Sequence, residues 1–260
     1  MALSLLALVF LAIEPHFSFP QGAVANEQIV LRWVHIVAGI IWIGLLYFFN
    51  LVGTRTLKEL DAPVRGKVFP LMMSRAMWWF RWSGLVTVLM GLRYFWILLA
   101  ADAQNAGNPA LAWRWLGEWF LVWIVAFALI YPFQTPHTGI LDSVWVRAIA
   151  ISVIAIAASW IVLVLNANEQ SSNGHLAIAV GGGMGLLMLL NAWGIIWRAQ
   201  KRLIAWTRAS AEHGTPMPPE AAKLARWAFL ASRTGFWMSL PMLFFMAAAD
   251  HYPFLSSLVD

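Results

Sequence analysis

The chain of 260 residues contains no cysteine. Disulfide bonds, zinc–thiolate sites and iron–sulfur clusters all require cysteine sulfur, so none of them can form within this chain. The C-x-x-C-H motif that attaches haem c is excluded for the same reason. Any metal ion or haem must therefore be held by histidine, methionine, carboxylate or tyrosine side chains.

Charged residues are also scarce. They make up 11% of the chain, whereas a soluble domain carries about 25%. Hydrophobic residues make up 61%, and the mean hydropathy is +0.72. Such a chain cannot face water on all sides, and at about 20 residues per crossing its length allows six or seven spans. We therefore predict an all-α fold, a polytopic bundle of transmembrane helices in a lipid bilayer, with one domain over residues 30–255.

Six segments have the length and apolar character of a membrane span. They are residues 31–53, 77–100, 113–133, 144–166, 175–197 and 229–249. Residues 198–211 predict a helix that continues beyond the fifth span, and the Gly214-Thr215-Pro216 sequence predicts its end. A new helix is expected to begin at Glu220 and lead into the last span.

The first 29 residues are harder to interpret. Residues 1–13 are apolar but too few to cross a bilayer easily. They resemble either the hydrophobic part of a signal peptide or a short helix that is retained. We favour the retained helix, followed by a linker over residues 14–29 on the outer side.

Basic residues are concentrated in two connections, between the first and second spans and between the fifth and sixth. The connections 101–112 and 167–174 contain no lysine or arginine. Because lysine and arginine gather on cytoplasmic loops, we predict a protein of the bacterial inner membrane with cytoplasmic basic loops and a periplasmic C-terminus. The net charge of +5 thus reports orientation, and we do not expect nucleic acid as a partner.

Tryptophan and glycine suggest how the helices pack. Some of the 17 tryptophans belong to interfacial belts, but Trp42, Trp123, Trp160 and Trp237 lie too deep in their spans for a belt. The sequence Gly-Gly-Gly-Met-Gly at residues 181–185 is a small-residue face. Such a face predicts close approach of a neighbouring helix.

Four of the six histidines fall on the predicted outer side: His16, His35, His175 and His251. Histidine is a common axial ligand of haem and a common metal ligand. We predict haem b or a metal ion between His35 and His251, with His175 and His16 as alternative ligands. The competing interpretation is a set of interfacial histidines without any ligand.

Charged and amide side chains inside the spans are the remaining candidates, because charge within a membrane is costly. Arg93 and Glu118 lie at similar depth, which predicts an ion pair between adjacent helices; alternatively, Arg93 binds a haem propionate. Four polar residues lie nearer the inner side and could together form an anion site. Alternatively, the two arginines reach the inner interface and the two asparagines form hydrogen bonds across helices. These four are Arg81, Arg233, Asn50 and Asn191.

Several stretches together resemble one family. They are residues 32–44 (R-W-V-H-I-V-A-G-I-I-W-I-G), 75–82 (R-A-M-W-W-F-R-W), 191–193 (N-A-W), 233–241 (R-T-G-F-W-M-S-L-P) and 250–253 (D-H-Y-P). They are similar to the membrane domain of the bacterial urate oxidase (urate hydroxylase) family. In that family an N-terminal helical membrane domain is followed by a C-terminal cytochrome c domain.

The resemblance implies that the membrane domain handles a substrate and passes electrons to a periplasmic cytochrome c. His35 and His251 would then be the motif histidines on the side that faces the cytochrome. The present chain departs from the family because it has no cytochrome c domain and no cysteine to attach haem c. We therefore expect the cytochrome c to be a separate partner.

Two functions follow as hypotheses. The first is a membrane redox protein, oxidoreductase-like if catalytic, that passes electrons from a small substrate or quinone to a separate periplasmic cytochrome c through haem b. The alternative is a non-catalytic accessory subunit of a larger respiratory or photosynthetic complex. A small-anion carrier that uses Arg81 and Arg233 is least favoured, because no broken helix or inverted repeat supports it.

Overall fold

A computed structural model describes residues 22–255, and within this range the chain is helical and has no β-strand. The expected short helix in residues 1–13 and the candidate ligand His16 lie outside the described residues. The α-helices are α2 (Ala23–Tyr47), α3 (Thr54–Glu59), α4 (Ala62–Asn105), α5 (Ala110–Gln134), α6 (Val144–Asn166), α7 (Asn173–Asn191), α8 (Trp197–His213) and α9 (Ala221–His251). The predicted all-α bundle is confirmed.

Three short turns complete the helical order. The π-helical turn η1 (Phe48–Gly53) joins α2 to α3, and the π-helical turn η3 (Ala192–Ile196) joins α7 to α8. The 3₁₀ turn η2 (Gly139–Asp142) precedes α6. Because the π-turns do not interrupt the helices, Ala23–Glu59 and Asn173–His213 are each continuous helical stretches.

Five helical stretches are long and apolar enough to cross a membrane. They are Ala23–Glu59, Ala62–Asn105, Ala110–Gln134, Val144–Asn166 and Asn173–His213, and they contain five of the six predicted spans. The sixth predicted span, 229–249, is helical as part of α9 but is less apolar, because Arg233 and Pro241 interrupt its hydrophobic residues.

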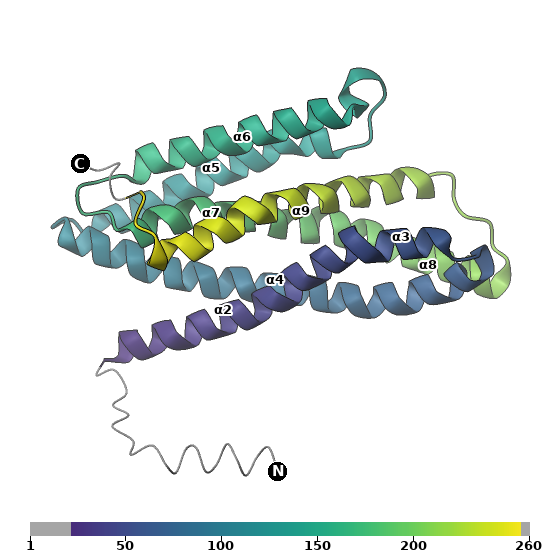
Figure 1. Ribbon diagram of the computed structural model, residues 1–260, viewed down its shortest axis with the longest axis horizontal. Helices are drawn as coiled ribbons and strands as arrows, with labels where there is room; N and C mark the ends of the chain where they lie inside the picture. The colour runs from purple at the N-terminus through teal and green to yellow at the C-terminus, as the bar shows by residue number, and fades with distance from the viewer. Residues whose placement is uncertain (1–21, 256–260) are drawn as a thin grey trace, which may run out of the picture.

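The helices run alternately between two ends of the bundle (Figure 1). One end, the basic end, carries the connections 60–61, 135–143 and 214–220. The other, the His175 end, carries the connections 106–109 and 167–172, the start of α2 and the end of α9. Helix α9 lies along α7, α2 crosses α4, and α5 and α6 form a hairpin on one side (Figure 1).

The predicted basic connection between the first two spans is largely helical. Helix α4 already begins at Ala62, and α8 ends at His213, followed by Gly214 in the left-handed conformation with φ 66°. The early part of α4 packs against α8, and an added Cβ at Gly66 would lie 3.3 Å from the Cβ of Ala211. Tertiary packing thus stabilises a helical segment whose charges alone indicate a loop. The predicted end of the 198–211 helix is confirmed.

Helix α7 is the central helix. In the most apolar part of the stretch Asn173–His213, to which α7 belongs, 78% is buried inside the bundle. The corresponding share is 28% or less in the other four stretches. The predicted close approach at residues 181–185 is confirmed, because the indole of Trp123 occupies the space where a Cβ of Gly183 would lie. A similar contact joins α2 to α4, where the indole of Trp42 lies against Gly84.

Two of the four deep tryptophans belong to the core. Trp42 and Trp123 are 1% and 0% exposed, whereas Trp160 and Trp237 are exposed on the outer faces of α6 and α9. Large apolar side chains are exposed on α2, α4, α5, α6 and α9, as expected for helices whose outer faces contact lipid.

Candidate functional site

A cavity of about 500 Å³ lies between α2, α4, α7 and α9, in the half of the bundle nearer the His175 end. One face of α2 lines it from end to end, through Arg32, His35, Gly39 and Trp42. These positions recur at intervals of three or four residues, which places them on the same side of an α-helix. The walls are predominantly apolar, so the few polar groups determine what the cavity can bind.

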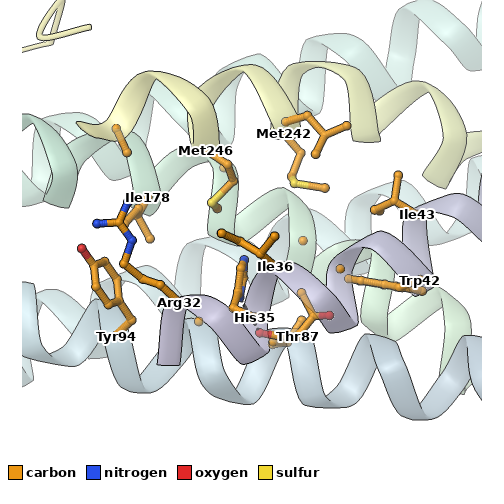
Figure 2. A pocket seen from close by; sticks show the side chains of 18 of the residues that line it. Arg32, His35, Ile36, Trp42, Ile43, Thr87, Tyr94, Ile178, Met242 and Met246 are labelled. Atoms are coloured by element: carbon orange, nitrogen blue, oxygen red, sulfur yellow. Dashed lines mark hydrogen bonds between the residues drawn. The ribbon is translucent and has the colours of Figure 1, made fainter. Parts of the chain in front are cut away.

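His35 is the central polar group of the cavity. Its Nδ1 lies 2.8 Å from the carbonyl oxygen of Thr87 on α4. Because a carbonyl only accepts, Nδ1 carries the proton of this bond and Nε2 is left with a free lone pair. In Figure 2 the imidazole stands with Thr87 beneath it and Met246 above it. The hydrogen bond from Nδ1 to Thr87 fixes both the tautomer and the orientation of the ring. The same kind of bond orients histidines that bind a metal through their other ring nitrogen.

Gly91 makes room for the imidazole. A Cβ at Gly91 would lie 3.0 Å from Cε1 and Nδ1 of His35, which is tighter than an ordinary contact. The bond between His35 and Thr87 therefore depends on the absence of a side chain one turn along α4.

The wall opposite His35 is formed by α7 and α9. Gly181, Gly182 and Gly185 of α7 line the cavity, and a Cβ at Gly185 would have no atom within 4 Å. Met242 and Met246 extend from α9 toward α2 (Figure 2). The thioether sulfur of methionine is a soft ligand, so the two walls present an imidazole nitrogen and thioether sulfurs to one apolar space.

The two ends of the cavity differ in polarity. Near the His175 end, Arg32 forms an ion pair with Asp250, and its guanidinium lies 5.8 Å from the centre of the Tyr94 ring. Both Arg32 and Asp250 are partly exposed, so this charged end is the wetter one. At the far end Trp42 is buried, and its Nε1 has no hydrogen-bond partner. Figure 2 shows Tyr94 and Arg32 at one end and Trp42 at the other.

The structure does not bring His251 to His35. His251 is exposed, its Nδ1 lies 3.2 Å from the carbonyl oxygen of Ala247, and it is not among the residues that line the cavity. His175 is fully buried, with Nδ1 3.0 Å from Oδ2 of Asp102 and Nε2 3.2 Å from Oδ1 of Asn166. Neither of its ring nitrogens is free, and residues 22–255 contain no cluster of three or more residues suited to hold a metal ion.

The predicted pair between Arg93 and Glu118 does not form. Arg93 donates to both carboxylate oxygens of Glu27 on α2, over 2.6 and 2.9 Å. Glu118 instead accepts from Arg114, four residues earlier on α5, over 2.9 Å. A partner one turn away on the same helix needs no particular approach of the neighbouring helix. Arg32, rather than Arg93, is the arginine that lines the cavity.

The four residues of the predicted anion site make separate contacts. The guanidinium of Arg81 lies 3.9 Å from the ring centre of Trp197, and that of Arg233 lies 5.5 Å from the ring of Phe236. Asn50 donates to the hydroxyl of Ser232 over 2.9 Å. Asn191 is buried, and its Oδ1 has no partner. Aromatic faces stabilise a desolvated cation, but Nε of Arg81 is buried without a hydrogen-bond partner among residues 22–255, so the anion site stays a prediction.

No protein-family model, curated protein or solved structure matches this chain. The geometry of the site is therefore the main basis for a functional interpretation.

A buried polar cluster at the His175 end was not expected from the sequence. Oδ2 of Asp102 accepts from the backbone N–H of Ser172 over 2.8 Å, from its hydroxyl over 3.0 Å and from Nδ1 of His175 over 3.0 Å. The cluster ties the end of α4 to the start of α7. Two features of the sequence could have indicated this cluster. Asp102 is an acidic residue at the end of a long apolar run, and Ser172 and His175 have the Ser-x-x-His spacing of a helix N-cap.

Proposed function

We propose that this protein is a membrane redox protein that holds haem b in the cavity beside His35. It would pass electrons from a small organic substrate or a quinone to a separate cytochrome c. The observation that carries the proposal is the imidazole of His35, fixed through Nδ1 on the Thr87 carbonyl. Its Nε2 is free toward an apolar cavity lined by glycines.

The residues present fit such a group. The cavity of about 500 Å³ falls within the range of about 300–1,000 Å³ typical of ligand sites. Gly39 and Gly185 leave room along the walls for a flat ligand, because a Cβ at either position would meet no atom closer than 3.7 Å. An apolar enclosure of low polarity is also one of the factors by which a protein tunes the potential of a haem.

His35 would hold the haem iron from the α2 side of the cavity. Met246 or Met242 on the opposite wall would hold it from the α9 side, in place of the His251 expected from the sequence. Histidine–methionine ligation is a known arrangement for electron-transfer haems. Arg32 at the partly exposed end would bind a propionate carboxylate, the role expected of Arg93 from the sequence. Haem b would supply one-electron transfer between its ferric and ferrous states.

The direction of transfer rests on charge and on the resemblance. The basic end carries the lysine and arginine residues of α3, of the first part of α4, of α8 and of the first turns of α9, which favours a cytoplasmic location for that end. The cavity lies nearer the opposite end, which would face the periplasm and a cytochrome c there. The likeness of residues 32–44 and 250–253 to the bacterial urate oxidase membrane domain supports the same direction of transfer.

The visible absorption spectrum of the protein purified from membranes tests the proposal. We expect a Soret band that shifts on reduction and that is lost in His35→Ala. His251→Ala is the matched control, because this exposed histidine lies outside the cavity, and the band should be retained. Met246→Ala and Met242→Ala should identify the second ligand by a change in the reduced spectrum.

A colourless preparation after expression with sufficient haem would refute haem binding. If such a preparation also co-purified in fixed stoichiometry with larger membrane proteins, the accessory-subunit hypothesis would replace the redox one. Loss of the band in His251→Ala with retention in His35→Ala would assign the ligand to a different part of the bundle.

A further inference from the structure

A second cavity, of about 540 Å³, lies at the basic end. It is formed where the end of α5 and the segment after it meet α8 and the first turns of α9. Unlike the cavity beside His35, it is lined by several charged side chains. Its charged and aromatic lining residues are Tyr131, His137, Arg202, Glu220, Lys223 and Trp227.

Two of these residues are cations that form no ion pair in the part of the chain that the structure describes. Arg202 on α8 and Lys223 in the first turn of α9 are both exposed, and neither forms an ion pair within residues 22–255. Arg226, one turn further along α9, is by contrast bound to both carboxylate oxygens of Asp142, over 2.8 and 3.0 Å. The partial positive charge of the α9 N-terminus adds to the field of Arg202 and Lys223. Together they make this side of the cavity attractive to an anionic group.

One carboxylate lines the same cavity. Glu220 immediately precedes α9, is exposed and forms no ion pair within the described residues. A simple anion such as free phosphate would be repelled by it. A ligand that carries a phosphate and an ammonium group within a few bonds would instead be complementary to all three charges.

The aromatic side of the cavity fits the membrane interface. The rings of Tyr131 and Trp227 lie 6.0 Å apart in an edge-to-face arrangement, and Nε1 of Trp227 is buried without a hydrogen-bond partner. Tyrosine and tryptophan gather at the depth of lipid headgroups. The cavity also borders α5 and α8, which belong to stretches apolar enough to cross a membrane.

We propose that this cavity binds the headgroup of a zwitterionic phospholipid whose phosphodiester is flanked by a primary ammonium group. Arg202 and Lys223 hold the phosphate, and Glu220 accepts from the ammonium group. The rings of Tyr131 and Trp227 form the aromatic wall beside the headgroup. Basic pockets between helices are recurrent sites for lipid headgroups. The carboxylate of Glu220 favours headgroups that carry an ammonium group.

Native mass spectrometry of the full chain in detergent tests the site. Phosphatidylethanolamine, phosphatidylglycerol and phosphatidylcholine with identical acyl chains are added to lipid-stripped protein. We expect phosphatidylethanolamine to bind most tightly, and Arg202→Gln and Lys223→Gln each to weaken its binding about tenfold, the loss expected of one hydrogen bond to a charged group. Lys201→Gln, the neighbouring cation on α8 outside the cavity, should leave binding unchanged.

Glu220→Gln separates recognition from loss of folding. It should weaken binding of phosphatidylethanolamine and strengthen binding of phosphatidylglycerol, which a misfolded protein could not do. Equal binding of all three lipids would overturn the proposal. Equal binding of the ethanolamine and choline lipids would overturn the role of Glu220. If inorganic phosphate or O-phosphoethanolamine displaced the lipid with comparable affinity, the ligand would be a soluble phosphate compound and not a phospholipid.

Discussion

Replacement of Gly183 by alanine should destabilise the bundle more than any other single methyl addition along α7. An ideal Cβ at Gly183 would lie 1.8 Å from Cε2 and 1.9 Å from Nε1 of Trp123, about half of an ordinary contact of 3.4 Å. Trp123 is 0% exposed and packed on all sides. Its indole cannot turn away without displacing other core residues, because protein interiors are close-packed.

The size of the effect follows from two contributions. Overpacking a well-packed core costs about 1–3 kcal/mol. Displacement of the indole also breaks its hydrogen bond to the carbonyl oxygen of Ala179, which is 3.1 Å long, at a cost of about 1 kcal/mol. The total of about 2–4 kcal/mol corresponds to a decrease of roughly 10 °C in melting temperature for a chain of this size.

The assay is thermal unfolding of the purified protein in detergent, followed by circular dichroism. Gly117→Ala is the matched control, since Gly117 is also inside a long helix but a Cβ there would meet no atom within 4 Å. This control should melt at or slightly above the parent temperature, because alanine favours the helix over glycine by about 0.5–1 kcal/mol. Equal melting temperatures for Gly183→Ala and the parent would refute the tight contact between α5 and α7.

Three further outcomes are expected. Asp102→Ala leaves a buried polar cluster without its acceptor and should lower the free energy of unfolding by about 3–5 kcal/mol. Replacement of the exposed Glu212 by alanine should change it little. Equal melting temperatures of the two variants would refute a structural role for the cluster. The guanidinium of Arg226 lowers the pKa of Asp142, in the connection before α6, so the stabilisation by this carboxylate is present above its unfolded pKa and is lost as pH falls through the lowered folded value. The parent should therefore lose more stability than Asp142→Asn when melting is measured from pH 7 down to pH 3, and parallel curves would contradict this. Gly91→Val should push the His35 ring off the Thr87 carbonyl and abolish the absorption band proposed above, which a spectrum of the purified variant would check.

The sequence predicted the helices well wherever apolar runs were long. It did not predict that α4 begins at Ala62, because Arg65, Lys67 and Arg75 resemble the charges of a cytoplasmic loop. The extension is helical because it packs against α8, and such tertiary packing overrides local composition. Helix α9 is less apolar because it contains Arg233, whose guanidinium lies over the rings of Phe236 and Trp237 on the same helix.

The candidate site was predicted in part. His35 could be identified from its depth within the first span, and it lines the main cavity. Its expected partner His251 does not, because successive residues on a helix are about 100° apart and it is Asp250 that faces the cavity. Met242 and Met246 recur at helical spacing, which is equally typical of packing residues. Only the position of His35 across the cavity distinguishes them. The contributions of Gly91 and Thr87 depend on how α2 crosses α4, which no local pattern specifies.

The two tryptophan–glycine contacts bear on how fast a ligand can enter and leave. Trp42 against Gly84 and Trp123 against Gly183 lock α2 to α4 and α5 to α7. Neither pair can slide or roll without withdrawing an entire indole from its neighbour. Opening by separation of α2 from α4, or of α5 from α7, would therefore be slow, on the microsecond-to-millisecond scale or beyond. Rotation of partly exposed side chains takes only picoseconds to nanoseconds, so the end of the cavity at the Arg32–Asp250 pair offers the faster route for entry.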